Sequence, residues 1–193
     1  MQDAFRQPGH RAPAPTPELR EVQAFVNTVD VEGDADAIRT ADDLAIWLRE
    51  RGALPQNGRV TAEEHDRAIA IREGLRALGR INNDEPVEAE PLARMNGALG
   101  AVRMIAALEP GRWELRPATR GVDGYLGTLL GSVVAAMADG SWARVKSCRN
   151  DVCRWLFYDY SRNHSGTWCT MAICGSRMKA RAYRSRRREA PAE

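Results

Sequence analysis

The chain has 193 residues and a hydrophobic fraction of 44%, which is enough for one domain, or one domain with a small appendage, to bury a real core. A formal net charge of +2 conceals an uneven distribution. Residues 1–143 hold 16 Arg against 22 acidic residues, whereas residues 144–188 hold 12 Lys and Arg against two Asp. These values exclude a chain that is disordered throughout, and they indicate that the basic end meets a polyanion.

Membrane and secretory features are not expected. We find no run of 18 or more apolar residues, and residues 1–20 lack the apolar core of a secretory signal. We therefore expect a cytoplasmic protein without a membrane span. All four cysteines lie between positions 148 and 174, and in a reducing compartment such clustering favours metal ligation over disulfides.

Four prolines and almost no large apolar residues mark residues 1–17, which we predict to be a flexible lead. The folded body is expected to begin near Glu18. A first short helix is predicted from apolar residues at helical spacing: Leu19, Val22, Phe25 and Val26.

Two further helices are predicted from their N-terminal signals. Thr40 and Thr61 are each followed three residues later by an acidic residue and then by apolar residues at helical spacing, which is typical of a capped helix start. We expect the two helices to end at Gly52 and Gly79.

A fourth helix is predicted with Pro91 in its first turn and its end at Pro110 and Gly111. Its apolar stripe would contain Leu92, Met95, Leu99, Val102 and Ala106. Residues 113–116 alternate between apolar and polar side chains and predict a short strand.

A fifth helix is predicted over residues 123–138, with its end at Gly140. Its buried residues would be Leu126, Leu129, Leu130, Val133 and Met137. The glycines at 121, 124, 127 and 131 lack the order of a nucleotide-binding loop, so we expect them to allow close helix packing. Residues 18–143 are thus predicted to form a mainly α domain.

The cysteine spacing predicts a zinc site. Cys148 and Cys153 are separated by four residues, fifteen residues follow, and Cys169 and Cys174 are again separated by four. Four thiolates can close a tetrahedral site without an open position for water, which predicts one structural zinc per chain. A disulfide pair, an iron–sulfur cluster and four inert cysteines are the alternatives.

The residues between the two cysteine pairs predict a small β-hairpin. Residues 155–158 are a strand-like aromatic run, and residues 161–166 form a polar turn. His164, in that turn, is the one competing ligand, and we expect it to lie on the surface because four thiolates suffice.

A basic helix is predicted after the last cysteine. Arg177, Arg181, Arg184 and Arg188 would share one stripe, which suits a phosphate backbone or a major groove. Met178, Ala182 and Ser185 would share another stripe that lies on the zinc module. The predicted nucleic-acid contacts are Arg177, Lys179, Arg181, Arg184, Arg186, Arg187 and Arg188. The alternative is a solvated basic tail, and residues 189–193 are predicted to be a short tail in either case.

Residues 148–188 resemble the CGNR zinc-finger family, which is named for a Cys-Gly-Asn-Arg tetrad at the fourth ligand. The segments AFVNTVD and ADDLAIWLRERGAL resemble the ABATE domain, which precedes that finger in bacterial proteins. The resemblance implies a helical domain over residues 18–143 and a treble-clef-like zinc module over residues 144–188, with Cys148, Cys153, Cys169 and Cys174 as ligands. It also implies that Gly175 and Arg177 belong to the tetrad, whereas Ser176 replaces its Asn.

The resemblance implies a stress-induced, DNA-binding transcription regulator that is cytoplasmic and associated with the nucleoid. The helical domain would sense a small-molecule effector or mediate assembly, for example as a homodimer, while the zinc module binds double-stranded DNA. An RNA-binding or ribosome-associated protein is the alternative, with Trp155, Phe157 and Tyr158 as a stacking platform. We expect no enzyme, because the sequence contains no metalloprotease motif, nucleophile elbow or phosphate loop.

Overall fold

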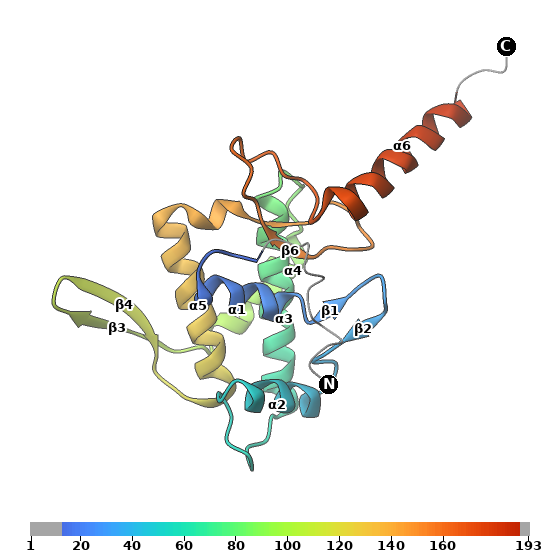
Figure 1. Ribbon diagram of the computed structural model, residues 1–193. Helices are drawn as coiled ribbons and strands as arrows, with labels where there is room; N and C mark the ends of the chain where they lie inside the picture. The colour runs from blue at the N-terminus through green and yellow to red at the C-terminus, as the bar shows by residue number, and fades with distance from the viewer. Residues whose placement is uncertain (1–12, 190–193) are drawn as a thin grey trace.

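The computed structural model describes residues 13–189 (Figure 1). This part of the chain is mainly α, with six α-helices and three two-stranded antiparallel hairpins. The elements of the helical domain are α1 (Pro17–Val26), β1 (Val29–Asp30), β2 (Ala35–Asp36), α2 (Ala41–Glu50), α3 (Ala62–Ile81), α4 (Ala89–Leu99), β3 (Met104–Glu109), β4 (Arg112–Pro117) and α5 (Gly121–Asp139). The elements that follow are the 3-10 helix η1 (Ser141–Arg144), β5 (Val145–Ser147), β6 (Leu156–Tyr158), the π-helical turn η2 (Met171–Gly175) and α6 (Ser176–Glu189).

The folded body begins earlier than expected. Ala14 is buried, and its N–H donates to Gln23 Oε1 at 2.8 Å. Thr16 caps α1 through its side chain, and Pro17 occupies the first helical position, which its fixed φ suits. Residues 13–17 therefore belong to the fold and not to the predicted flexible lead, whereas residues 1–12 and 190–193 lie outside the described residues.

The predicted starts of α2 and α3 are confirmed. Thr40 and Asp43 form a reciprocal capping box, and Thr61 and Glu64 form a second one. Each box satisfies amide groups that the first turn of a helix leaves without a partner.

Helix α3 does not end at Gly79, as the sequence suggested, but continues to Ile81. A Cβ atom at Gly79 would lie 2.6 Å from Leu156 Cδ1 and 3.1 Å from the amide nitrogen of Ser147. The glycine is there because hairpin β5–β6 crosses the helix at this point. It marks a close contact and not a helix end.

The prediction for the fourth helix is correct only in its first half. Helix α4 ends at Leu99, and Ala106 lies on β3, where it pairs with Leu115. Apolar residues at 104, 106 and 108 fit a period of two as well as a helical stripe, and the Pro110–Gly111 turn, with Gly111 at φ 81°, allows the chain to fold back as a hairpin. The predicted strand at residues 113–116 is confirmed as part of β4.

Helix α5 packs closely on hairpin β3–β4 and the loop that follows it through Gly124, Gly127 and Gly131, as predicted, whereas a Cβ atom at Gly121 would meet no atom within 4 Å. A Cβ atom at Gly124 would lie 2.4 Å from the carbonyl oxygen of Thr119, and one at Gly131 would lie 3.0 Å from that of Leu115. Gly140 ends the helix in the left-handed conformation. Met137, predicted to be buried, is 47% exposed.

By length and composition alone, α5 is apolar enough to cross a membrane, which the sequence analysis did not anticipate. In the described structure α5 packs against α1, α3 and β4. Leu126, Leu129 and Val133 are buried in the main core. We therefore describe α5 as a core helix.

Hairpin β5–β6 and the helical domain share one core. Val145 and Leu156 belong to the same buried cluster as Phe25, Ile71 and Leu126. The hairpin therefore packs as part of the helical body, and Figure 1 shows it beside α1 and α3.

Candidate metal centre and nucleic-acid surface

The first cysteine pair lies in the loop that joins β5 to β6. Cys148 N donates to the carbonyl of Trp155 at 2.9 Å, and Cys153 N donates to that of Asn150 at 2.7 Å. Arg154 follows at φ 52°, which turns the chain back into β6. The hairpin thus encloses the first ligand pair and does not lie between the two pairs, as the sequence suggested, because β6 pairs with residues that precede Cys148.

The second pair lies where the chain enters α6. Cys174 belongs to the π-helical turn η2, whose start is capped by the side chain of Thr170. A Cβ atom at Gly175 would lie 2.7 Å from Met171 Sδ and 3.2 Å from the Trp168 ring. A larger residue here would displace the end of the Met171 side chain and press on the Trp168 ring.

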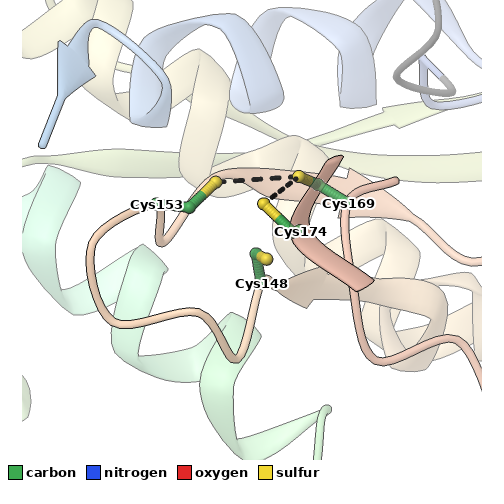
Figure 2. A group of neighbouring side chains, drawn as sticks. All are labelled: Cys148, Cys153, Cys169 and Cys174. Carbon is green, nitrogen blue, oxygen red and sulfur yellow. Dashed lines mark hydrogen bonds between the residues drawn. The ribbon is translucent and has the colours of Figure 1, made fainter. Parts of the chain in front are cut away.

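The four thiol groups converge on one point (Figure 2). Their sulfur atoms lie within 4.8 Å of one another, and Cys169 Sγ lies 3.6 Å from both Cys153 Sγ and Cys174 Sγ. These separations are too long for a disulfide bond and match the spacing of about 3.8 Å between thiolates around tetrahedral zinc. All four cysteines are buried and free.

This geometry fits one zinc ion held by Cys148, Cys153, Cys169 and Cys174. Four thiolates leave no position for a reacting water molecule, so the ion supplies a structural crosslink between the β5–β6 loop and the start of α6.

Hydrogen bonds within the cluster favour a first thiolate at Cys148. Its interactions with the neighbouring thiols of Cys153 and Cys169 lower the pKa of Cys148 to about 4. The same contacts raise the pKa of Cys153 and Cys169, because a thiol that donates a hydrogen bond is held in its protonated form. Asn150 Nδ2 lies 3.6 Å from Cys174 Sγ and supports the fourth ligand from outside the cluster.

A buried ion pair braces the loop between β6 and the second ligand pair. Lys146 Nζ donates to Asp159 Oδ2 at 2.9 Å and to the carbonyl groups of His164 and Gly166. Burial raises the pKa of Asp159, but hydrogen bonds from Ser161 and Lys146 outweigh it and lower that pKa to about 2. The carboxylate is thus charged at neutral pH and holds the loop in place.

Helix α6 extends from the zinc site away from the body (Figure 1). Met178 is partly buried, but Ala182 and Ser185 are exposed, so the predicted packing of this stripe on the zinc module is wrong beyond the first turn. Helical spacing predicts a stripe, but within the described residues the main packing partner of α6 is η2, at its base. The described part of α6 is therefore accessible on several faces.

The seven basic residues predicted to contact nucleic acid all lie on α6 and are exposed. Arg177, the first of them, is held by Glu32 in the β1–β2 turn, with Nη1 at 2.6 and 2.7 Å from the two carboxylate oxygens. Among the residues that the structure describes, no carboxylate pairs with the other six: Lys179, Arg181, Arg184, Arg186, Arg187 and Arg188.

Two families match the chain, one for each part of this arrangement. The family described as "CGNR zinc finger" matches residues 144–187. The ABATE family, described as "Putative stress-induced transcription regulator", matches residues 19–140, which is more than half of the chain. The chain belongs to the ABATE family and carries a CGNR zinc finger. No curated protein matches it.

In this CGNR finger, Ser176 stands where the family tetrad has Asn. Its hydroxyl donates to the carbonyl of Met171 at 3.1 Å, which closes the turn that carries Cys174. The substitution therefore keeps a local hydrogen bond at the start of α6.

The aromatic residues proposed as a stacking platform for RNA lie largely inside the CGNR finger. Trp155 and Phe157 are 5% and 4% exposed and pack against the ligand cysteines, while Tyr158 is partly buried. The predicted platform is wrong, because an alternating strand next to a metal site uses its aromatic face to build a small core. His164 lies in an exposed turn at φ 51° and is not among the converging ligands.

Sequence analysis missed the polar residues that dock the finger on the ABATE domain. Asn27 accepts from the N–H of Leu156 at 2.7 Å and donates to its carbonyl at 2.9 Å. Asn83 donates to the carbonyl groups of Ser147 and Thr167. Asn27 lies within the AFVNTVD segment, but nothing in the sequence pairs it with a strand 129 residues away.

Proposed function

We propose that this protein is a DNA-binding transcription regulator in which α6 contacts duplex DNA. The observation that carries the proposal is that α6 stands clear of the body while its basic side chains are exposed. Exposed guanidinium groups without carboxylate partners are available to neutralise phosphates and release counterions.

The dimensions of α6 support a groove contact. Its 14 residues span roughly 21 Å, and a helix fits the major groove, which is about 12 Å wide. Arg181 and Arg184 lie on one face, and Lys179 and Arg186 lie nearly opposite, so a helix between two phosphate strands can contact both. The zinc site fixes the base of this helix and thus its direction.

In this proposal the ABATE domain is the part that senses an effector or mediates assembly, including as a homodimer, and it performs no enzymatic reaction. A transcription regulator acts in the cytoplasm, here in association with the nucleoid. The regulatory stimulus is stress, in keeping with the description of the family.

The zinc-loaded full chain should be tested by fluorescence anisotropy against duplex DNA, the matching single strand and a structured RNA. We expect tighter binding to the duplex, with an affinity that falls steeply with salt. Equal or tighter binding to RNA would instead favour the RNA-binding alternative. Duplex binding that is unchanged when α6 is deleted would remove this helix from the interface. A genome-wide binding map of the tagged protein would then identify the sequences that are recognised.

A further inference from the structure

A groove of about 490 Å³ lies where α3, the start of α4 and the β5–β6 loop with Cys148 and Cys153, here called the zinc knuckle, meet. Its volume is in the range of pockets for small organic ligands. Helix α3 contributes one wall, α4 contributes another, and Arg154, which follows the ligand Cys153, closes the end next to the finger. The groove therefore touches both the ABATE domain and the CGNR finger.

The floor of the groove contains a buried guanidinium group. Arg76 is 5% exposed, donates to Glu73 and to the carbonyl of Val26, and has an Nε atom without a hydrogen-bond partner among the described residues. Burial lowers the pKa of Arg76, and the charge of Glu73 opposes that effect. Because Glu73 already pairs with this guanidinium, the floor supplies no free cation, and an anionic ligand would have to be held at the rim.

The rim of the groove carries cations that are weakly paired. Arg154 has no carboxylate partner among the described residues, and its Nε donates to the carbonyl of Asp151. Arg94 lies 3.6 Å from Glu90, and both side chains are more than half exposed. An exposed ion pair of this kind contributes little to stability, so Arg94 can readily exchange Glu90 for the anionic group of a ligand.

The remaining charges and the apolar lining restrict the kind of ligand. Arg80 is held by Glu85 and Glu88, so it is already neutralised. Ala70, Ala77, Ala89 and Pro91 supply small apolar surfaces between the charged groups. A ligand that satisfies both features has one anionic group and a compact apolar body.

We propose that this groove binds a small organic carboxylate, with the acid group between Arg94 and Arg154 and the apolar body against the alanines of α3. This ligand class deepens the proposed function by giving the ABATE domain an effector, and its regulatory meaning rests on that proposal. Because Arg154 follows Cys153 directly, an occupant of the groove contacts the knuckle that fixes α6.

Benzoate is a suitable probe, with benzamide as its neutral counterpart and inorganic phosphate as an anion without an apolar body. Each is titrated into the isotope-labelled, zinc-loaded full chain, without DNA, and followed by amide chemical shifts. We expect saturable shifts confined to α3, α4 and the knuckle. Benzoate should bind about tenfold more tightly than benzamide or phosphate.

Arg94→Ala and Arg154→Ala should each weaken benzoate binding by about fivefold or more, and Arg59→Ala is the control because Arg59 is exposed and outside the groove. The inference would be overturned by shifts that do not saturate or that lie outside the groove. It would also be overturned if benzamide or phosphate bound as tightly as benzoate, or if neither substitution changed the affinity for benzoate. If the protein binds benzoate in this groove but does not bind duplex DNA, the ligand site is supported and the proposed function is contradicted. If it binds duplex DNA but not benzoate, only the ligand site is contradicted.

Discussion

Glu32, in the β1–β2 turn, holds both carboxylate oxygens within 2.7 Å of Nη1 of Arg177, the tetrad arginine at the start of α6. Both side chains are about half exposed, so the pair adds little to stability. Its importance lies in competition, because a carboxylate on Arg177 occupies donors that a phosphate or a base edge would use.

Removing this carboxylate should strengthen DNA binding. We expect Glu32→Gln to increase duplex affinity by about two- to fivefold at constant salt, with less than about 1 kcal/mol change in the free energy of unfolding. Asp34→Asn is the matched control, because it removes the same charge from the same turn but affects a pair with Arg39. Equal gains in both variants would mean that the turn acts only through its overall charge.

Asn27 should be essential for docking the CGNR finger on the ABATE domain. Asn27→Ala leaves the N–H of Leu156 buried without its acceptor, while the Leu156 carbonyl keeps a bond from Gln23. We expect a loss of about 2 to 3 kcal/mol in chemical unfolding. Asn57→Ala, at an exposed loop position, should change stability by less than about 0.5 kcal/mol, and a similar small loss at Asn27 would contradict the docking role.

The contrast between the zinc site and this docking contact explains what the sequence could predict. Four cysteines at short spacing reveal a site because zinc chemistry requires those ligands wherever the chain brings them together. The bonds of Asn27 and the close approach at Gly79 depend on a strand far along the chain, so the local pattern alone predicts a helix end at Gly79. Local patterns indicate which face is apolar, but they do not identify the neighbour.

The sequence also could not decide the secondary structure of residues whose apolar pattern fits both a helical and a strand period. Residues 104–108 fit both a helix and a strand, and only the pairing of Leu108 with Trp113 distinguishes the two. The buried guanidinium of Arg76 was also missed, although Arg72, Arg76 and Arg80 recur every four residues on α3. This row of arginines along one face of a long capped helix was the sequence signal that could have indicated a buried guanidinium group.

Loss of one zinc ligand should destabilise the whole chain. Cys169→Ser is expected to reduce the metal content from one zinc per chain to none, as measured by elemental analysis of protein purified without added metal. Because Val145 and Leu156 belong to the main core, calorimetry should show the unfolding transition of the helical body moving to lower temperature. A body of unchanged stability would indicate two independent folding units.

The Lys146–Asp159 pair predicts a separable dependence on pH. The folded pKa of Asp159 is about 2, below its ordinary value of 3.8, so its stabilisation is complete above about pH 5 and is lost as the pH falls through 4 toward 2. At pH 7, Asp159→Asn should cost about 3 kcal/mol or more, because it leaves the buried ammonium of Lys146 without its counter-charge. The unfolding free energies of the two proteins should differ by a constant amount between pH 7 and 5 and converge below pH 4. Convergence already at pH 6 would contradict the assignment.

The final prediction concerns the outer turns of α6. If Arg184 and Arg188 contact phosphates, replacing both by Ala should reduce the slope of log affinity against log salt by about 1.8 in magnitude and weaken all duplexes alike. Arg177 lies nearest the zinc-anchored base, so Arg177→Ala should instead cost about 1 to 3 kcal/mol on a preferred site and little on random DNA. Met178→Ala is the control, because this partly buried side chain should affect stability without changing the slope. Equal slopes for the wild type and the double variant would make α6 a solvated basic tail, since removing two counterion-releasing groups from a real interface must change the number of ions released.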